Sequence, residues 1–152
     1  MKVKTFSDLI VWTREVHHRL AECMAHCSTQ SERELAKMLL TYLADHEATL
    51  EKIVDGFMKR ADPKALNTWV YDYLEKQPID PHRTCDAPFA KMSVDEICEA
   101  VFDLHNQVIA LYRYLLGRAE IPEARELLQA LLDMEEHETM RLAQQTNRIR
   151  FM

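Results

Sequence analysis

The chain repeats itself in outline, and a histidine and a glutamate hold the same places in both copies. Glu47 follows His17 by 30 residues, and Glu135 follows His105 by 30 residues. The offset of 88 residues between these pairs also aligns apolar positions: Ala36 with Ala124, Leu39 with Leu127, Leu40 with Leu128 and Leu43 with Leu131. A repeat of this kind favours two similar helical hairpins that share one interior, to which each hairpin contributes a polar group.

Apolar residues recur with helical spacing in four long segments. The segments cover about 7–27, 31–61, 93–117 and 122–149. Ser31 with Glu34, and Ser93 with Glu96, have the spacing of a capping box, which predicts where the second and third helices begin. Only 2 glycines and 5 prolines occur in 152 residues, and this composition agrees with a mostly helical chain.

Residues 62–92 lie between the two hairpins and differ in character from them. Pro63 suits the first turn of a short helix that runs to about Lys76, and the proline-rich stretch after it is irregular. Such a length suits a crossover rather than a turn between neighbouring antiparallel helices. The sequence predicts one all-α domain, an antiparallel four-helix bundle with one long crossover that carries a short helix. The domain is expected to span 1–152, with hairpins at about 7–61 and 93–149.

Charged side chains interrupt the apolar faces of these helices. Glu47, Glu135 and Glu138 fall at core positions, while His17 and His105 lie on or beside the same faces. A buried carboxylate loses several kcal/mol of solvation unless a cation, a proton or hydrogen bonds compensate. Carboxylate oxygens and imidazole nitrogens together bind non-haem iron and manganese. These five residues are therefore the predicted ligands of iron or another divalent transition metal.

These features resemble the ferritin-like superfamily, in particular its rubrerythrin-like members. The likeness covers nearly the whole chain and includes the segments Leu-Ala-Asp-His-Glu and Leu-Leu-Asp-Met-Glu-Glu-His-Glu. In that family the first and third helices each supply a glutamate, and the second and fourth each carry Glu-x-x-His. By position, His17 and His105 replace the single glutamates, whereas Glu47 and Glu135 match the motif glutamates.

The motif histidines are replaced by Leu50 and Glu138, so the ligand set departs from the standard di-iron pattern. The chain's only Glu-x-x-His, Glu15 with His18, lies on the first helix, where the family does not use it. What the resemblance implies is the bundle fold, iron binding, and redox or stress-related chemistry with oxygen or peroxide.

A second function stays open on the sequence. Histidine and glutamate can satisfy one another in a core, so a metal-free, non-catalytic bundle could act as a dimeric scaffold or interaction protein. His46 and His137 flank the glutamates; they could support the ligands or line the mouth of the site, but such helical histidines are more often half-exposed and paired with neighbouring carboxylates. A homodimer is expected, because helical bundles often pair and the 8 methionines offer adaptable apolar surface.

Several classes of protein are excluded. A net charge of −6 gives no electrostatic footprint for nucleic acid, and no glycine-rich loop indicates a nucleotide site. No apolar run approaches the roughly 20 residues that a membrane span needs. The first residues lack the apolar core of a signal peptide, so a cytoplasmic protein is expected.

In the cytoplasm, cysteines are expected to be free thiols. The chain has four: Cys23, Cys27, Cys85 and Cys98. A zinc-like set could form only if the crossover folded against the end of the first helix. It would consist of Cys23, His26, Cys27, His82 and Cys85. Their spacing matches no strong zinc motif.

Overall fold

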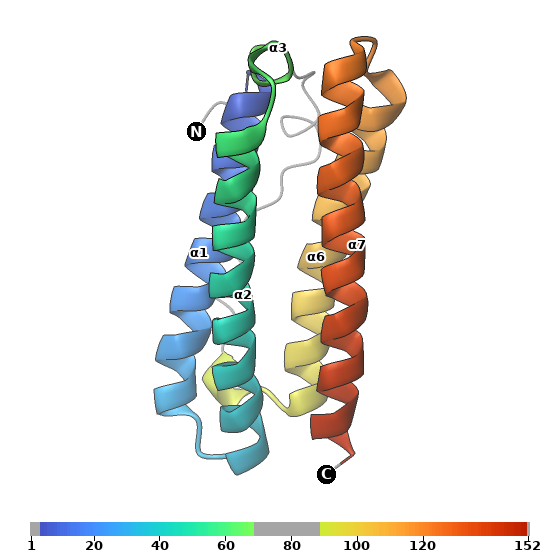
Figure 1. Cartoon of the computed structure of the whole chain (residues 1–152). Coiled ribbons are helices and arrows are strands. Elements are labelled where there is room, and N and C mark those ends of the chain that lie inside the picture. The colour runs from blue at the N-terminus through green and yellow to red at the C-terminus, as the bar shows by residue number, and fades with distance from the viewer. Residues whose placement is uncertain (1–3, 69–88, 152) are drawn as a thin grey trace.

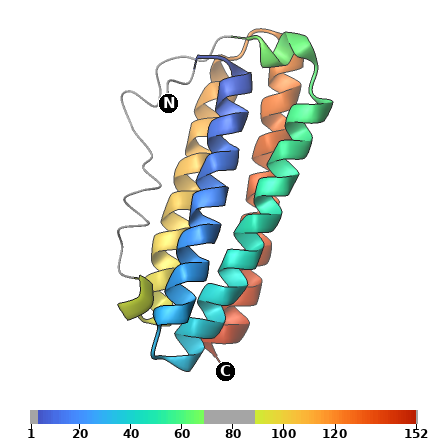
Figure 2. The same cartoon turned by 90° about the vertical axis from the view of Figure 1, so that its left-hand side faces the viewer.

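Four long helices lie side by side and form a bundle (Figure 1). The computed structural model describes residues 4–68 and 89–151. Its helices are α1 (Phe6–Gln30), α2 (Glu34–Arg60), the short α3 (Pro63–Leu66), the 3-10 turn η1 (Phe89–Lys91), α6 (Val94–Arg118) and α7 (Pro122–Arg150). Helix α1 packs against α2, and α6 packs against α7 (Figure 2). The predicted all-α four-helix bundle is confirmed.

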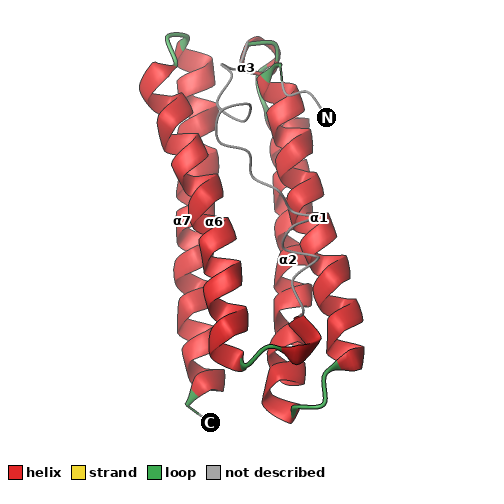
Figure 3. Ribbon diagram, turned by 180° about the vertical axis from the view of Figure 1, so that it is seen from behind, coloured by secondary structure: helices red, strands yellow, loops and turns green. Residues whose placement is uncertain are grey.

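The directions of the helices show how the two hairpins are joined. Helix α2 ends at the end of the bundle that carries α3, whereas α6 begins at the opposite end, next to η1 (Figure 3). Helices α2 and α6 therefore run in the same direction, so a crossover and not a tight turn connects the hairpins.

The short helix predicted for residues 63–76 is shorter in the structure. Helix α3 ends at Leu66, and Asn67 and Thr68 form a turn. The carbonyl of Thr68 accepts a hydrogen bond from the backbone N–H of Phe6 at 3.0 Å, which ties this turn to the start of α1. The remaining residues of the predicted helix, 69–76, lie outside the described part of the chain.

One of the two predicted capping boxes is present and the other is wrong. The backbone N–H of Glu96 donates to the hydroxyl of Ser93 at 3.2 Å, and the Glu96 carboxylate accepts from the Ser93 N–H at 3.1 Å. Helix α1, however, continues to Gln30, so Ser31 ends that helix instead of starting the next. Arg33 precedes the first turn of α2 and makes no side-chain capping bond.

This difference predicts opposite outcomes for two similar substitutions. We expect Ser93→Ala to lower the free energy of unfolding by about 1 kcal/mol, because it removes a formed cap. The matched change Ser31→Ala should stay within about 0.5 kcal/mol of the wild type, since no cap is lost. Urea unfolding of the two variants measures both values. Equal losses would contradict the assignment of the caps.

The apolar stripes read from the sequence meet in the core of the bundle. Leu20, Leu43, Leu111 and Leu131 come from the four long helices, and each is no more than 1% exposed. Leu35 of α2, in contrast, is 39% exposed and lies outside this core. Within the described residues, no helix combines the length and the apolar character that crossing a bilayer requires.

The cysteines differ in part from the expectation. Cys27 is half-buried and Cys98 is buried, and both are free thiols. Cys23 is disulfide-bonded, so the expectation of a free thiol is wrong at this position. His82 and Cys85 of the zinc-like set lie outside the described residues.

Candidate metal centre

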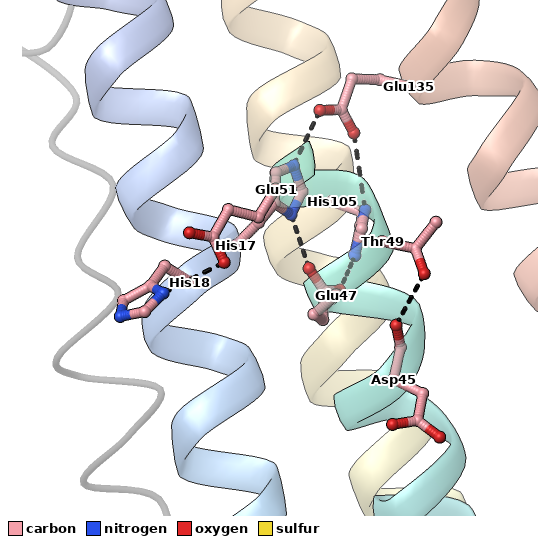
Figure 4. Close-up of polar contacts among 8 residues, drawn as sticks. All are labelled: His17, His18, Asp45, Glu47, Thr49, Glu51, His105 and Glu135. Carbon is pink, nitrogen blue, oxygen red and sulfur yellow. Dashed lines mark hydrogen bonds and ion pairs between the residues drawn. The ribbon is translucent and has the colours of Figure 1, made fainter. Parts of the chain in front are cut away.

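Four of the predicted ligands meet in the middle of the bundle, one from each long helix. His17 comes from α1, Glu47 from α2, His105 from α6 and Glu135 from α7, and each is no more than 1% exposed (Figure 4). The 88-residue repeat places each pair at matching heights of the two hairpins, and the apolar stripes turn both pairs inward.

These side chains form a ring in which histidines and glutamates alternate. Nδ1 of His17 lies 2.5 Å from Glu47, and Nε2 of the same ring lies 2.9 Å from Glu135. Nε2 of His105 lies 2.5 Å from the other oxygen of Glu47. On the fourth side, Nδ1 of His105 is 3.8 Å from Glu135, too long for a hydrogen bond. We call these four residues the His–Glu ring.

The charges of the His–Glu ring balance one another. Burial alone lowers the pKa of His17 and His105, but the two carboxylates outweigh it and raise these pKa values to about 10 and about 9. Burial alone raises the pKa of each glutamate, yet the two imidazolium ions lower that of Glu135 to about 2 and that of Glu47 further. Near neutral pH, two cations and two anions therefore share a site without bulk water.

The fourth side of the ring is not closed by a hydrogen bond. Nδ1 of His105 and Oε2 of Glu135 are buried, and neither has a hydrogen-bond partner among the described residues. His17, Glu47 and His105 each offer one ligand atom, and these three atoms lie within 4.8 Å of one another. Two imidazoles and two carboxylates are a donor set that suits a divalent transition metal.

The remaining predicted residues lie outside the ring. Glu138 is 8% exposed, and its carboxylate accepts a hydrogen bond from Arg141 at 3.4 Å. His46 is half-buried, and burial lowers its pKa. His137 is exposed. Leu50, at the place of a motif histidine, is 0% exposed and belongs to the core.

A buried hydroxyl pair that the sequence analysis missed lies in the same core. The hydroxyl oxygens of Thr13 and Tyr112 are 2.7 Å apart, and the Thr13 hydroxyl also lies 3.0 Å from the Leu9 carbonyl. Burial raises the pKa of Tyr112, and the negative charge of Glu135 adds to that effect. Thr13 precedes His17 by one helical turn, so its position on the same face of the helix could have predicted that it is buried. Tyr112 gave no such signal, because a tyrosine on an apolar face is ordinarily a packing residue.

Comparison with known proteins supports the fold. No protein-family model matches the chain, and neither does any curated protein. A crystal structure of a proposed ferritin-like diiron-carboxylate protein from Thermotoga maritima superposes with a TM-score of 0.61 at 14% sequence identity. The match covers 97% of this chain and 98% of that one. At this identity, the likeness shows a shared fold.

Proposed function

We propose that the chain, which has a ferritin-like fold, binds one divalent transition metal, iron or a similar ion, in the His–Glu ring for redox or stress-related work. The observation that carries the proposal is that ligand atoms of His17, His105 and Glu47 lie within 4.8 Å of one another at the centre of the core, with the Glu135 carboxylate against His17. Folds host unrelated functions, so the site and not the fold is the basis of the proposal.

The residues present fit a single ion better than two. In the di-iron members of this fold, four glutamates and two histidines hold the pair of metals. Here Leu50 occupies one motif position and Glu138 lies against Arg141, which leaves four donors in the His–Glu ring. A bound iron ion would supply one-electron chemistry, while the surrounding leucines exclude water and the four helices fix the donors.

A second candidate function has its own support. Three sides of the His–Glu ring are already closed by hydrogen bonds of 2.5–2.9 Å. A charge-balanced network of this kind can exist without a metal. In that case the chain would be a structural bundle that acts as a dimeric scaffold or interaction protein.

Metal content separates these two functions. We expect untagged protein, loaded anaerobically with ferrous iron and then desalted, to retain about one metal ion per chain by mass spectrometry. A His17→Leu/His105→Leu variant, which lacks both imidazoles, should retain almost none. Values near zero for the wild type would contradict the proposal and favour the metal-free bundle.

A further inference from the structure

A cavity of about 520 Å³ lies at the end of the bundle that carries α3. Its walls come from α1, α3 and the turn that joins α6 to α7, and α3 and this turn lie at the same end of the molecule (Figure 1). Leu115, on its wall, follows His105 by ten residues of α6, which is about 15 Å along the helix. The cavity is therefore separate from the His–Glu ring.

The inner wall of the cavity is apolar. Phe6 of α1 and Leu115 of α6 line it and are 3% and 2% exposed, whereas Ile121 is 40% exposed. Ala119 adds a further apolar side chain. Small-molecule sites in proteins have volumes of roughly 300–1,000 Å³ and are mostly apolar, with a few polar groups that orient the ligand. In size and lining, this cavity suits an apolar body of several carbon atoms.

The charges around the cavity favour an anion. Lys64 and Arg118 line it, and Glu120 is the one acidic residue among the described residues that do so. The guanidinium carbon of Arg118 lies 4.6 Å from the centroid of the Tyr114 ring, and no carboxylate of the described residues pairs with this arginine. Lys64 is 4.0 Å from Glu123, too far for a hydrogen bond. Arg118 is thus a positioned cation without a counter-ion.

The start of α7 adds positive potential at the same place. Ile121, which lines the cavity, directly precedes the first turn of α7, and no side chain caps that turn. The unpaired backbone N–H groups of a helix start attract negative charge. Glu123 in this turn offsets part of the potential, so the main attraction for an anion comes from Arg118.

We propose that this cavity binds a free medium-chain fatty acid, whose alkyl chain contacts Phe6 and Leu115 and whose carboxylate pairs with Arg118. The planar guanidinium matches a carboxylate through two parallel hydrogen bonds. A wholly polar anion would leave the apolar wall in contact with water, and a neutral apolar molecule would leave Arg118 unpaired. The inference goes beyond the proposed function, because no residue of the His–Glu ring takes part.

Calorimetric titration tests the fatty-acid site. The protein, without added metal, is titrated with decanoate and, separately, with 1-decanol, which has the same alkyl chain and no charge. We expect one decanoate per chain, and an affinity for 1-decanol that is lower by about tenfold or more. Arg118→Gln should weaken decanoate binding by about tenfold and leave 1-decanol binding unchanged.

A matched control is available on the same helix. Arg113→Gln also removes one positive charge from α6, but Arg113 pairs with Glu136 at 2.6 Å and does not line the cavity. Its affinity for decanoate should equal that of the wild type.

Two substitutions of Ile121 separate charge from shape. Asparagine and aspartate are both suited to cap α7, so neither Ile121→Asn nor Ile121→Asp should unfold the protein. Ile121→Asp adds a negative charge beside the bound carboxylate. We expect it to bind decanoate about tenfold more weakly than Ile121→Asn does, while the two variants bind 1-decanol equally.

Three results would overturn the inference. They are a wild type that does not bind decanoate, equal affinities of the wild type for decanoate and 1-decanol, and an Arg118→Gln variant that binds decanoate as the wild type does. None of them alters the metal content of the His–Glu ring, so the proposed function is tested separately.

Discussion

Replacing Glu47 by glutamine is expected to lower the free energy of unfolding of the metal-free protein by roughly 3 kcal/mol. The Glu47 carboxylate accepts hydrogen bonds from His17 and from His105, each at 2.5 Å, in a place that water does not reach. An amide of the same shape accepts only through its oxygen and carries no charge. One buried imidazolium would then lose its counter-ion.

A surface pair on the same helices provides the control. Glu51 accepts a hydrogen bond from His18 at 3.0 Å, but these side chains are 30% and 42% exposed. We expect Glu51→Gln to change the free energy of unfolding by less than about 0.5 kcal/mol, since solvent screens such pairs. Urea unfolding in the presence of a chelator measures both variants. Equal effects would show that the His–Glu ring does not stabilise the core.

The helices were predictable because their signals are local. The stripe of α7, from Ala124 to Ile149, repeats at helical spacing and is buried as predicted. The wrong prediction of a capping box at Ser31 has a physical cause. The sequence pattern of a capping box specifies only residue types and their spacing, whereas Ser31 can cap α2 only if α1 ends before it, and α1 continues to Gln30. A residue that ends one helix shortly before the next begins can therefore fit the sequence pattern for the end of the first helix and also that for the start of the second.

The site was predictable to the level of helix faces. The repeat brought His17, Glu47, His105 and Glu135 to one interior, and the structure places them there. Glu138 shares the inward face of α7 with Glu135, yet it lies outside the ring with Arg141. Helical phase tells which face a residue occupies, but the neighbour it meets depends on how α2 and α7 pack, and this is not encoded in local spacing.

Stability of the metal-free protein is expected to depend on pH in two directions. The raised pKa values of His17 and His105, about 10 and about 9, mean that their protonation stabilises the folded state. This contribution is complete below the ordinary histidine value of 6.5 and is lost as the pH rises through 9 to 10. Glu135, lowered from 4.5 to about 2, contributes above pH 4.5 and loses its contribution as the pH falls toward 2. Urea unfolding over a pH series should therefore give a maximum between pH 4.5 and 6.5.

Metal binding should follow the opposite trend on the alkaline side. A metal ion needs imidazoles without their extra protons, so binding near pH 7 should release about two protons per ion, one from each histidine. Affinity then rises with pH while the stability of the metal-free protein falls. Proton release can be measured in weakly buffered solution with an indicator dye during addition of Zn²⁺. Binding without proton release would mean that the ion occupies a place other than the His–Glu ring, because two protonated imidazoles cannot ligate it.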